Sequence, residues 1–385
     1  MAHASTIEIL RKLISFDTTS ANSNLELLAY VQDYLNQHGV DSTLVYNEEE
    51  SKANLYATIG PQDKPGVMLS GHTDTVPVTG QNWTFEPYQL NERDGRYYGR
   101  GTADMKTYLA VALAAVPEMQ KQTLHTPIHL AFSYDEEIGC VGVRRLIETL
   151  QGHPLKPAIC IIGEPTTMQV VTAHKGKLAA RVTVKGKECH SGMAPLGVNA
   201  VNYAARLINW LEQLAQQKKT EGPFEDGYDI PYSTVHTGTV NGGTALNIVP
   251  NHCSFLFEIR NIAAEDPREL LAQFQAYADQ LVTEMRETSS ECDIQIDITT
   301  EYPGLSTADD EEVVAFVRSL TSNKERGNIN FGTEGGLFSQ VLGIPTVVCG
   351  PGSMDQGHKP DEFIHADQIS QCEAFMARLI NQLSA

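Results

Sequence analysis

Five short segments, far apart in the chain, carry a histidine or a carboxylate beside glycine or directly after an apolar run. They are Gly71–Asp74, Gly99–Asp104, Asp135–Glu137, Gly163–Pro165 and Gly357–Pro360. Together they offer two imidazoles and several carboxylates, which are ligand types that zinc and similar divalent ions accept. The seven cysteines show no C-x-x-C spacing, so a thiolate site is not expected. The set therefore predicts a metallohydrolase with a pair of ions.

Five of these side chains are the expected metal ligands, with one carboxylate shared by the two ions. They are His72, Asp104, Glu137, Glu164 and His358. Such a set leaves an open position on each ion for water. Two ions about 3.5–4 Å apart lower the pKa of that water from ~16 toward neutrality.

Two further acids are expected to work beside the ligands. Glu136 and Glu137 are adjacent, so one side chain can bind metal while the other faces the water. Glu136 is the expected general base, which takes a proton from the water and returns it to the leaving amine. Asp74 stands two residues after His72, where a carboxylate can orient the imidazole. The chemistry implied is hydrolysis of an amide.

Each motif also has an ordinary structural explanation. A histidine with a nearby acid is often a buried hydrogen-bonded pair, and Asp104 could cap the apolar helix that follows it. Adjacent acids on a surface are usually solvated. The combination of all five segments in one chain favours the metal site.

Continuous apolar runs predict the strands that must position these residues. Runs of this kind are typical of sheets covered on both faces, as in α/β proteins, where sites form at the carboxyl ends of strands. The runs are Val67–Ser70, Ile128–Ser133, Ala158–Ile162 and Pro345–Cys349.

The pattern changes after about Thr172, where apolar and polar residues alternate. Period-two alternation suits antiparallel strands with one solvated face, and it recurs in Leu178–Val184, Cys253–Arg260 and Asp293–Thr299. Two helical stretches, about 198–217 and 267–287, lie between these strands.

The fold class predicted is α/β, with a discontinuous catalytic domain and an inserted α+β domain of a sheet plus two helices. The catalytic segments are expected at 1–173 and 301–385, and the insertion at 174–300. His358 lies beyond the insertion, so the site is expected to draw on both catalytic segments.

Charge and hydropathy exclude some partners. The net charge of −20 argues against nucleic acid, because neutralising phosphates requires clustered Lys and Arg. No stretch approaches the ~18 uninterrupted apolar residues of a membrane span. Charged side chains within Met1–Ser20 argue against a signal peptide, so a cytoplasmic location is expected. Gly99–Asp104 lacks the third glycine of a dinucleotide-binding loop.

Four motifs resemble those of the M20 family of co-catalytic zinc peptidases and deacylases. They are Gly71–Pro77, Gly99–Lys106, Asp135–Gly139 and Gly163–Thr166, and the match covers essentially the whole chain. The resemblance implies a zinc-peptidase-like α/β/α catalytic domain, a lid and dimerisation domain, and a homodimer formed through that lid. It also implies a cis peptide bond after Asp104.

The resemblance further implies a site with two zinc ions, with cobalt as a substitute ion. His72 and Glu164 would bind one ion, Glu137 and His358 the other, and Asp104 would bridge them. Glu136 matches the family's general base and Asp74 the residue that orients the histidine. His190 matches a histidine that relatives supply from the partner subunit to polarise the scissile carbonyl.

Further motifs are Thr234–Gly238, Gly242–Pro250, Gly332–Phe338, Gly350–Gly352 and His358–Phe363. They resemble motifs of the family members that deacetylate N2-acetyl-L-ornithine, a step of arginine biosynthesis. On this resemblance the substrate is a small N-acylated amino acid. Arg260 would grip its α-carboxylate, with Asn247 near the same group. Thr333 would contact substrate, and Glu334 would meet the ornithine ammonium. An ordinary salt bridge is the alternative for Arg260.

Other substrates stay open. A succinyl-diaminopimelate desuccinylase or a broad N-acyl-amino-acid amidohydrolase is the alternative, and some family members carry Asp at the Glu164 position. A binding protein without catalysis is disfavoured, because the base and every ligand are present.

Overall fold

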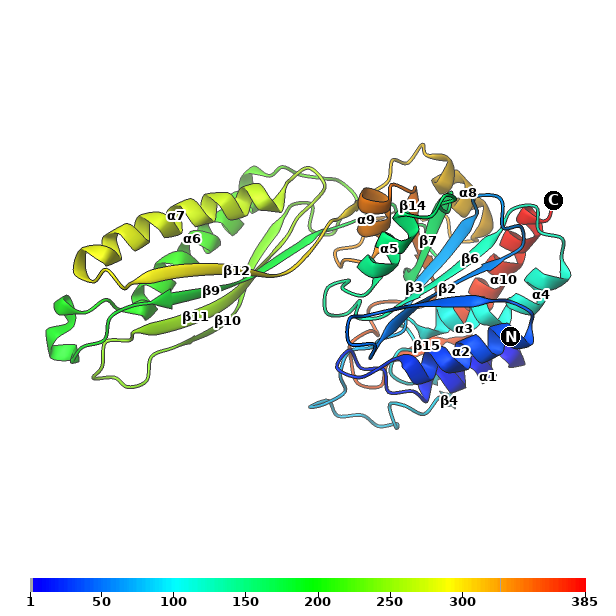
Figure 1. Cartoon of the computed structure of the whole chain (residues 1–385), viewed down its shortest axis with the longest axis horizontal. Helices are drawn as coiled ribbons and strands as arrows, with labels where there is room; N and C mark the ends of the chain where they lie inside the picture. The colour runs from blue at the N-terminus through cyan, green and yellow to red at the C-terminus, as the bar shows by residue number, and fades with distance from the viewer. Residues whose placement is uncertain (1–2, 326) are drawn as a thin grey trace. The chain divides into compact units, whose positions relative to one another are not determined.

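The computed structural model describes residues 3–325 and 327–385, and its contacts divide the chain into two units (Figure 1). Unit 1 comprises Met1–His174, Leu305–Ile329 and Thr333–Ala385, and unit 2 comprises Lys175–Gly304 and Asn330–Gly332. The prediction of a discontinuous α/β domain with an inserted α+β domain is confirmed. The main junctions fall at 174/175 and 304/305, whereas the sequence boundaries stand at 173/174 and 300/301.

Unit 1 is built on a six-stranded sheet in the order β1-β2-β6-β3-β7-β14. The central strands β6, β3, β7 and β14 run parallel to one another, whereas β1 and β2 are antiparallel neighbours at one edge. The strands are β1 (Ser42–Tyr46), β2 (Ala53–Ile59), β3 (Val67–His72), β6 (Ile128–Ser133), β7 (Ile159–Pro165) and β14 (Thr346–Gly350). Every residue of β3, β6 and β14 is buried, as expected for continuous apolar runs.

Elements pack on both faces of this sheet. Successive residues of β3 point to opposite faces. A Cβ at Gly71 would meet Met105 and Leu109, whereas the hydroxyl of Ser70 faces Glu334. The helices of unit 1 are α1 (Ala4–Ile14), α2 (Leu25–Gln37), α3 (Lys106–Ala114), α4 (Val116–Lys121), α5 (Val143–Gln151), α8 (Glu312–Leu320), α9 (Gly335–Leu337), the π-helical turn η2 (Phe338–Leu342) and α10 (Ala366–Leu383). Two small sheets complete the unit: β8 (Ala173–His174) with β13 (Leu305–Ser306), and β4 (Asn91–Arg93) with β5 (Arg96–Tyr98) and β15 (Phe363–His365).

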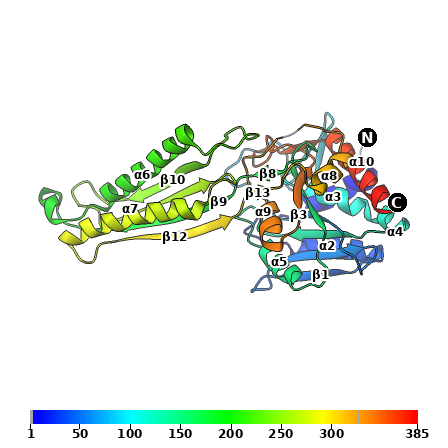
Figure 2. The same cartoon turned by 90° about the horizontal axis from the view of Figure 1, so that it is seen from above.

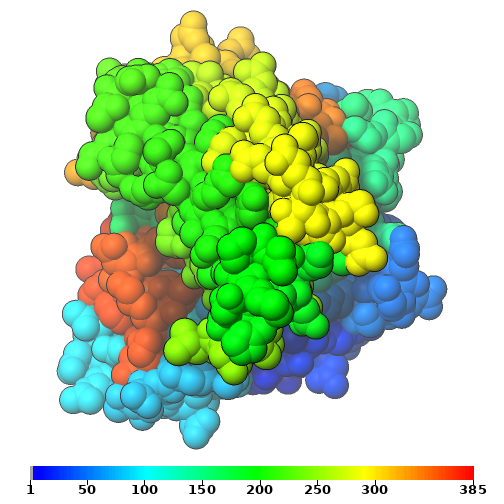
Figure 3. All heavy atoms as spheres, turned by 90° about the vertical axis from the view of Figure 1, so that its left-hand side faces the viewer, coloured from blue at the N-terminus to red at the C-terminus, as the bar shows by residue number. Residues whose placement is uncertain are grey.

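Unit 2 is a four-stranded antiparallel sheet with two long helices on one face (Figures 1 and 2). The strand order is β10-β11-β9-β12, and β11 alternates between buried and partly exposed residues, as its sequence predicts. The elements are β9 (Lys177–Lys185), the 3₁₀ turn η1 (Ser191–Leu196), α6 (Ala200–Glu221), β10 (Thr234–Gly242), β11 (His252–Arg260), α7 (Pro267–Thr288) and β12 (Asp293–Tyr302). Green and yellow atoms, which include those of α6 and α7, dominate the face of unit 2 seen in Figure 3.

Capping residues and aromatic contacts explain where the helices of unit 2 start and how they pack. The side chain of Asn199 caps α6 by accepting a hydrogen bond from the Asn202 N–H, and Asp266 caps α7 in the same way. The Trp210 and Phe274 rings, one from each helix, lie 5.4 Å apart in the core. Among the described residues, no helix is long and apolar enough to cross a bilayer.

Candidate metal centre

Two imidazoles and three carboxylates of unit 1 converge beyond the carboxyl ends of its central strands. His72 ends β3, and its Nε2 atom lies 3.0 Å from Asp104 Oδ1 and 3.6 Å from Glu164 Oε1. His358 arrives from the second chain segment, and its Nε2 atom lies 3.1 Å from Asp104 Oδ2 and 3.0 Å from Glu137 Oε2. The structure thus brings together all five expected ligands.

Asp104 has the geometry expected of a bridging ligand. Its Oδ1 atom faces the His72 imidazole, and its Oδ2 atom faces the His358 imidazole. The peptide bond from Asp104 to Met105 is cis, as the resemblance implies. The two oxygens of one carboxylate therefore point at two separate histidines.

The donor chemistry fits divalent cations. Within the described residues, donor atoms lie within 4.8 Å of one another in two sets, one of His72, Glu136 and Glu164, the other of His72, Asp104 and Glu137. Burial, followed by the charge of Asp104, raises the pKa of the Glu137 carboxyl to about 7 and that of Glu164 well above its usual value. Buried carboxylates crowded in this way require positive charge nearby. Imidazole with carboxylate is a ligand set that zinc accepts.

Asp74 holds more than the imidazole of His72. His72 Nδ1 lies 2.9 Å from the backbone oxygen of Asp74 and 3.5 Å from its Oδ1 atom, so the carbonyl is the nearer partner. The Asp74 carboxylate accepts hydrogen bonds from the backbone N–H groups of Glu136 (3.1 Å) and Glu137 (3.3 Å), and from the hydroxyl of Ser20 (2.7 Å). Asp74 therefore also holds the backbone that carries both acids.

Glu136 sits in a tight turn after β6. The Cys140 thiol donates a hydrogen bond to Glu136 Oε1 across 3.5 Å. The turn is closed by N–H groups of Gly139 and Cys140, which donate to the Glu136 carbonyl. Burial, reinforced by the neighbouring acids, raises the pKa of the Glu136 carboxyl well above its usual value.

Two glycines permit the close packing beneath the site. A Cβ at Gly163 would lie 2.1 Å from the Tyr108 ring, and one at Gly71 would lie 2.4 Å from the methyl carbon of Met105. Both glycines stand directly before an expected ligand, Glu164 or His72. A side chain at Gly163 would collide with the Tyr108 ring of α3, whereas one at Gly71 would require the Met105 and Leu109 side chains to move.

Three expected residues belong to unit 2. His190 and Asn247 are exposed and lie in neighbouring loops, where the Ser191 N–H donates to the backbone oxygen of Asn247 (3.0 Å). Arg260 ends β11, and its Nη1 atom donates to the Tyr302 hydroxyl across 2.9 Å. Its Nε atom also pairs with Glu258 Oε1 across 3.2 Å, so the ordinary salt bridge named as the alternative is present. The contacts described for these three residues are all with other residues of unit 2.

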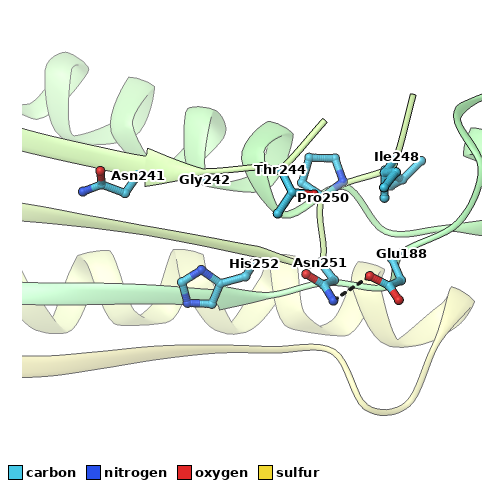
Figure 4. A pocket seen from close by; sticks show the side chains of 10 residues that line it. Glu188, Asn241, Gly242, Thr244, Ile248, Pro250, Asn251 and His252 are labelled. Carbon is cyan, nitrogen blue, oxygen red and sulfur yellow. Dashed lines mark hydrogen bonds between the residues drawn. The ribbon is translucent and has the colours of Figure 1, made fainter. Parts of the chain in front are cut away.

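A cavity of about 450 Å³ lies beside these loops in unit 2 (Figure 4). Asn251 Nδ2 donates to Glu188 Oε2 at its rim across 3.0 Å. Its lining residues are Glu188, Asn241, Gly242, Gly243, Thr244, Ile248, Val249, Pro250, Asn251 and His252. Neither His190 nor Asn247 lines it, so it is separate from the expected substrate contacts.

The last two expected residues, Thr333 and Glu334, are buried in unit 1. Thr333 Oγ1 accepts a hydrogen bond from the Gly335 N–H (2.9 Å). Glu334 is 1% exposed, and its Oε2 atom lies 3.5 Å from the Ser70 hydroxyl. Burial raises the pKa of its carboxyl to about 7. Its Oε1 atom accepts no hydrogen bond in the described part of the chain.

Sequence reasoning missed several residues that support the site. Ser20 and Cys140 contact Asp74 and Glu136, and neither stands in a recognisable pattern. Arg100 and Glu362 form a buried ion pair next to Asp104. Their signal was their position: Arg100 stands between Gly99 and Gly101, and Glu362 follows His358 by four residues.

Comparison with known proteins agrees with this geometry. The model of peptidase family M20/M25/M40 matches residues 68–382. The chain is 32% identical over 372 residues to a Pasteurella multocida (strain Pm70) protein named acetylornithine deacetylase, covering 96% of this chain and 94% of that protein.

Solved structures show the same fold. The M20 family metallo-carboxypeptidase Sso-CP2 from Sulfolobus solfataricus matches with a TM-score of 0.78 and 19% identity, covering 99% of this chain and 100% of that one. The YXEP protein of Bacillus subtilis, described as a dinuclear metal-binding peptidase of the M20 family, matches with a TM-score of 0.67 and 14% identity over 97% of this chain and 96% of its own.

Proposed function

Because the chain belongs to peptidase family M20/M25/M40, we propose that it hydrolyses N2-acetyl-L-ornithine to L-ornithine and acetate. The observation that carries the reaction type is Asp104, whose two oxygens lie 3.0 and 3.1 Å from two different imidazoles. The similarity to the Pasteurella protein supports the substrate.

The ligands proposed for the ions follow from these contacts. His72 and Glu164 would hold one zinc ion, Glu137 and His358 the other, and Asp104 would serve both, with cobalt as a substitute. When bound, such a pair polarises the amide carbonyl and lowers the pKa of water.

Glu136 is the proposed general base. In this role its carboxylate removes a proton from the attacking water and delivers it to the departing amine nitrogen, so that the amide bond breaks to give amine and acetate. The Cys140 thiol and the Asp74 carboxylate orient it through the side chain and the backbone, respectively. A carboxylate that is already oriented by hydrogen bonds loses less conformational entropy on reaching the transition state.

Substrate recognition is proposed to involve charges at both ends of ornithine. The forked guanidinium of Arg260 suits the α-carboxylate, with Asn247 nearby. A buried carboxylate oxygen without a donor is costly, and Glu334 Oε1 would gain one from an ammonium group. Thr333 stands next to Glu334 and is proposed to contact the substrate chain.

The proposal extends to assembly and location. Unit 2 is proposed to form a homodimer that brings His190 to the partner's scissile carbonyl. The exposure of His190 is compatible with a role outside its own unit. A cytoplasmic location is proposed as well.

A panel of substrates tests this function. Metal-loaded protein is assayed with N2-acetyl-L-ornithine, N-succinyl-L,L-diaminopimelate and other N-acetyl amino acids, and the released amine is quantified. The highest kcat/KM is expected for acetylornithine. A succinylated substrate that is clearly preferred would point to the desuccinylase alternative, and equal rates on many N-acyl amino acids to a broad amidohydrolase.

A further inference from the structure

The carboxylate of Glu362 gathers three backbone N–H groups of the turn that carries Asp104. Its Oε1 atom accepts hydrogen bonds from Ala103 (2.8 Å) and Asp104 (3.0 Å), and its Oε2 atom accepts one from Gly101 (3.1 Å). Glu362 is 1% exposed. Without this acceptor, three buried donors would lose their partner, so the carboxylate dictates the course of the turn.

Arg100 neutralises Glu362 and extends the network. Its Nη1 atom donates to Glu362 Oε2 across 2.6 Å, and both side chains are buried. Its Nη2 atom donates to Gln81 Oε1 across 2.7 Å, and its guanidinium lies 5.0 Å from the centre of the Trp83 ring. A buried charge pair of this kind defines one geometry, because losing either partner leaves the other uncompensated.

The other end of the network meets the backbone around His358. Gln81 Nε2 donates to the carbonyl of His358 across 2.8 Å, and Arg100 Nη1 lies 3.4 Å from the carbonyl of Lys359. The two ends therefore join segments separated by more than two hundred and fifty residues, one with Asp104 and one with His358.

We propose that Glu362, Arg100 and Gln81 are positioning residues of the metal centre, which hold the Asp104 turn and the His358 loop at the separation that two ions require. None of the three supplies a donor atom to the ligand cluster. Glu362 and Gln81 act through the backbone of Asp104 and His358, and Arg100 acts through Glu362 and Gln81. This inference rests on the metal centre proposed above and is independent of the substrate.

The network predicts different effects at its two ends. Asp104 is shared by both ions, so Glu362→Gln, which removes the charge and one acceptor, weakens both. Gln81 contacts the backbone of His358 directly but reaches the Asp104 turn only through Arg100, so Gln81→Ala is expected to weaken mainly the ion that His358 holds. Changes in residues that orient metal ligands typically lower metal affinity about 10- to 100-fold.

The test is a metal titration of the full chain, with the metal first removed by a chelator. Zinc binding is measured by calorimetry, and cobalt binding by the visible absorption that reports ligand geometry. Glu362→Gln is expected to weaken both sites and alter the cobalt spectrum. Gln81→Ala is expected to leave one site close to that of the parent protein.

The matched control is Glu265→Gln. It breaks another largely buried ion pair, the one between Lys218 and Glu265 in unit 2. It is expected to lower the melting temperature while metal affinity and the cobalt spectrum stay unchanged.

Two results would overturn the proposal. One is a folded Glu362→Gln protein with the parent affinity for both ions. The other is a Gln81→Ala protein that binds both ions with the parent affinity. This result decides the question if Glu362→Gln does not fold, because the Gln81 side chain is only half-buried and its loss is tolerated more easily. A parent protein that binds no metal would instead remove the centre itself. A failed substrate panel with intact metal binding would leave this inference standing.

Discussion

Three expected ligands of unit 1 and two expected loop residues of unit 2 are held in opposite ways, whereas His358 of unit 1 is exposed and Arg260 of unit 2 is half-buried. In unit 1, His72, Asp104 and Glu164 are at most 4% exposed, and each lies near another candidate ligand. In unit 2, His190 and Asn247 are exposed on loops. The contrast shows that packing fixes these groups of unit 1, whereas the two loop side chains of unit 2 are open to solvent.

Each arrangement has a physical rationale. Buried acids that lie close together destabilise a fold unless cations or hydrogen bonds compensate their charge. Proteins tolerate this cost at active sites, where the reaction requires groups in fixed positions. Groups that recognise substrate lose freedom when it binds, and exposed loops can supply them at little cost to stability.

The largest expected effect concerns Glu136, the proposed general base in unit 1. Glu136→Gln keeps the shape but removes the proton acceptor, so kcat should fall about 10²- to 10⁴-fold. Steady-state kinetics and metal analysis check this, with metal content expected to be unchanged. Glu148→Gln, at an exposed position of α5, is the control and should retain full activity. Parent-like turnover by Glu136→Gln would remove that residue from its role.

The next effect concerns the exposed loop of unit 2. His190→Ala removes a group proposed to stabilise developing charge on the carbonyl oxygen, and such groups contribute about 10²- to 10³-fold to kcat. Metal content and melting temperature should not change, because the side chain is exposed. A loss of bound metal in this variant would contradict the proposal that the metal ligands lie in unit 1 and that His190 acts only on the substrate.

A smaller effect is expected for substrate binding. Arg260→Lys keeps the charge but loses the fork, and a hydrogen bond to a charged group is worth about 1.5–3 kcal/mol. KM for acetylornithine should rise by about tenfold or more, with kcat changed less. Tyr302→Phe removes one partner of the guanidinium and serves as the control for mere repositioning. An unchanged KM for Arg260→Lys would exclude the carboxylate contact.

The last effect, on stability rather than on activity, is a pH dependence in the core of unit 1. Burial lowers the pKa of His129 to about 4, below the value of about 6.5 expected in the unfolded chain. The folded state therefore binds fewer protons, and this contribution is present above pH ~6.5 and lost as the pH falls toward 4. Urea unfolding of the parent and His129→Gln at several pH values measures it. The difference between the two should shrink on acidification, and a constant difference would contradict it.

Much of the fold was predictable because its signals are local. Strands β3, β6, β7 and β14 are apolar runs, and the first three end at or next to the acids and histidine that the sequence pattern selects. The alternation in β9, β11 and β12 likewise predicts a one-sided sheet. The return of Asn330–Gly332 to unit 2 has no local signal, because it depends on tertiary contacts.

The supporting contacts of the site were not predictable for the same reason. Glu362 and Asp104 are 258 positions apart, and Ser20 and Asp74 are 54 apart. Residue type predicted that Asp74 would orient His72, but not that its backbone oxygen would be the nearer partner or that its carboxylate would hold Glu136 and Glu137. Such contacts arise only once the strands are placed side by side.

Anomalous diffraction at the zinc edge, from crystals grown with zinc, tests the central claim most directly. The account predicts two peaks about 3.5–4 Å apart, the spacing of two-metal hydrolytic sites, with one oxygen of Asp104 on each. His72 and Glu164 should lie at one peak, and Glu137 and His358 at the other. A single peak, or two peaks of which Asp104 contacts only one, would contradict it.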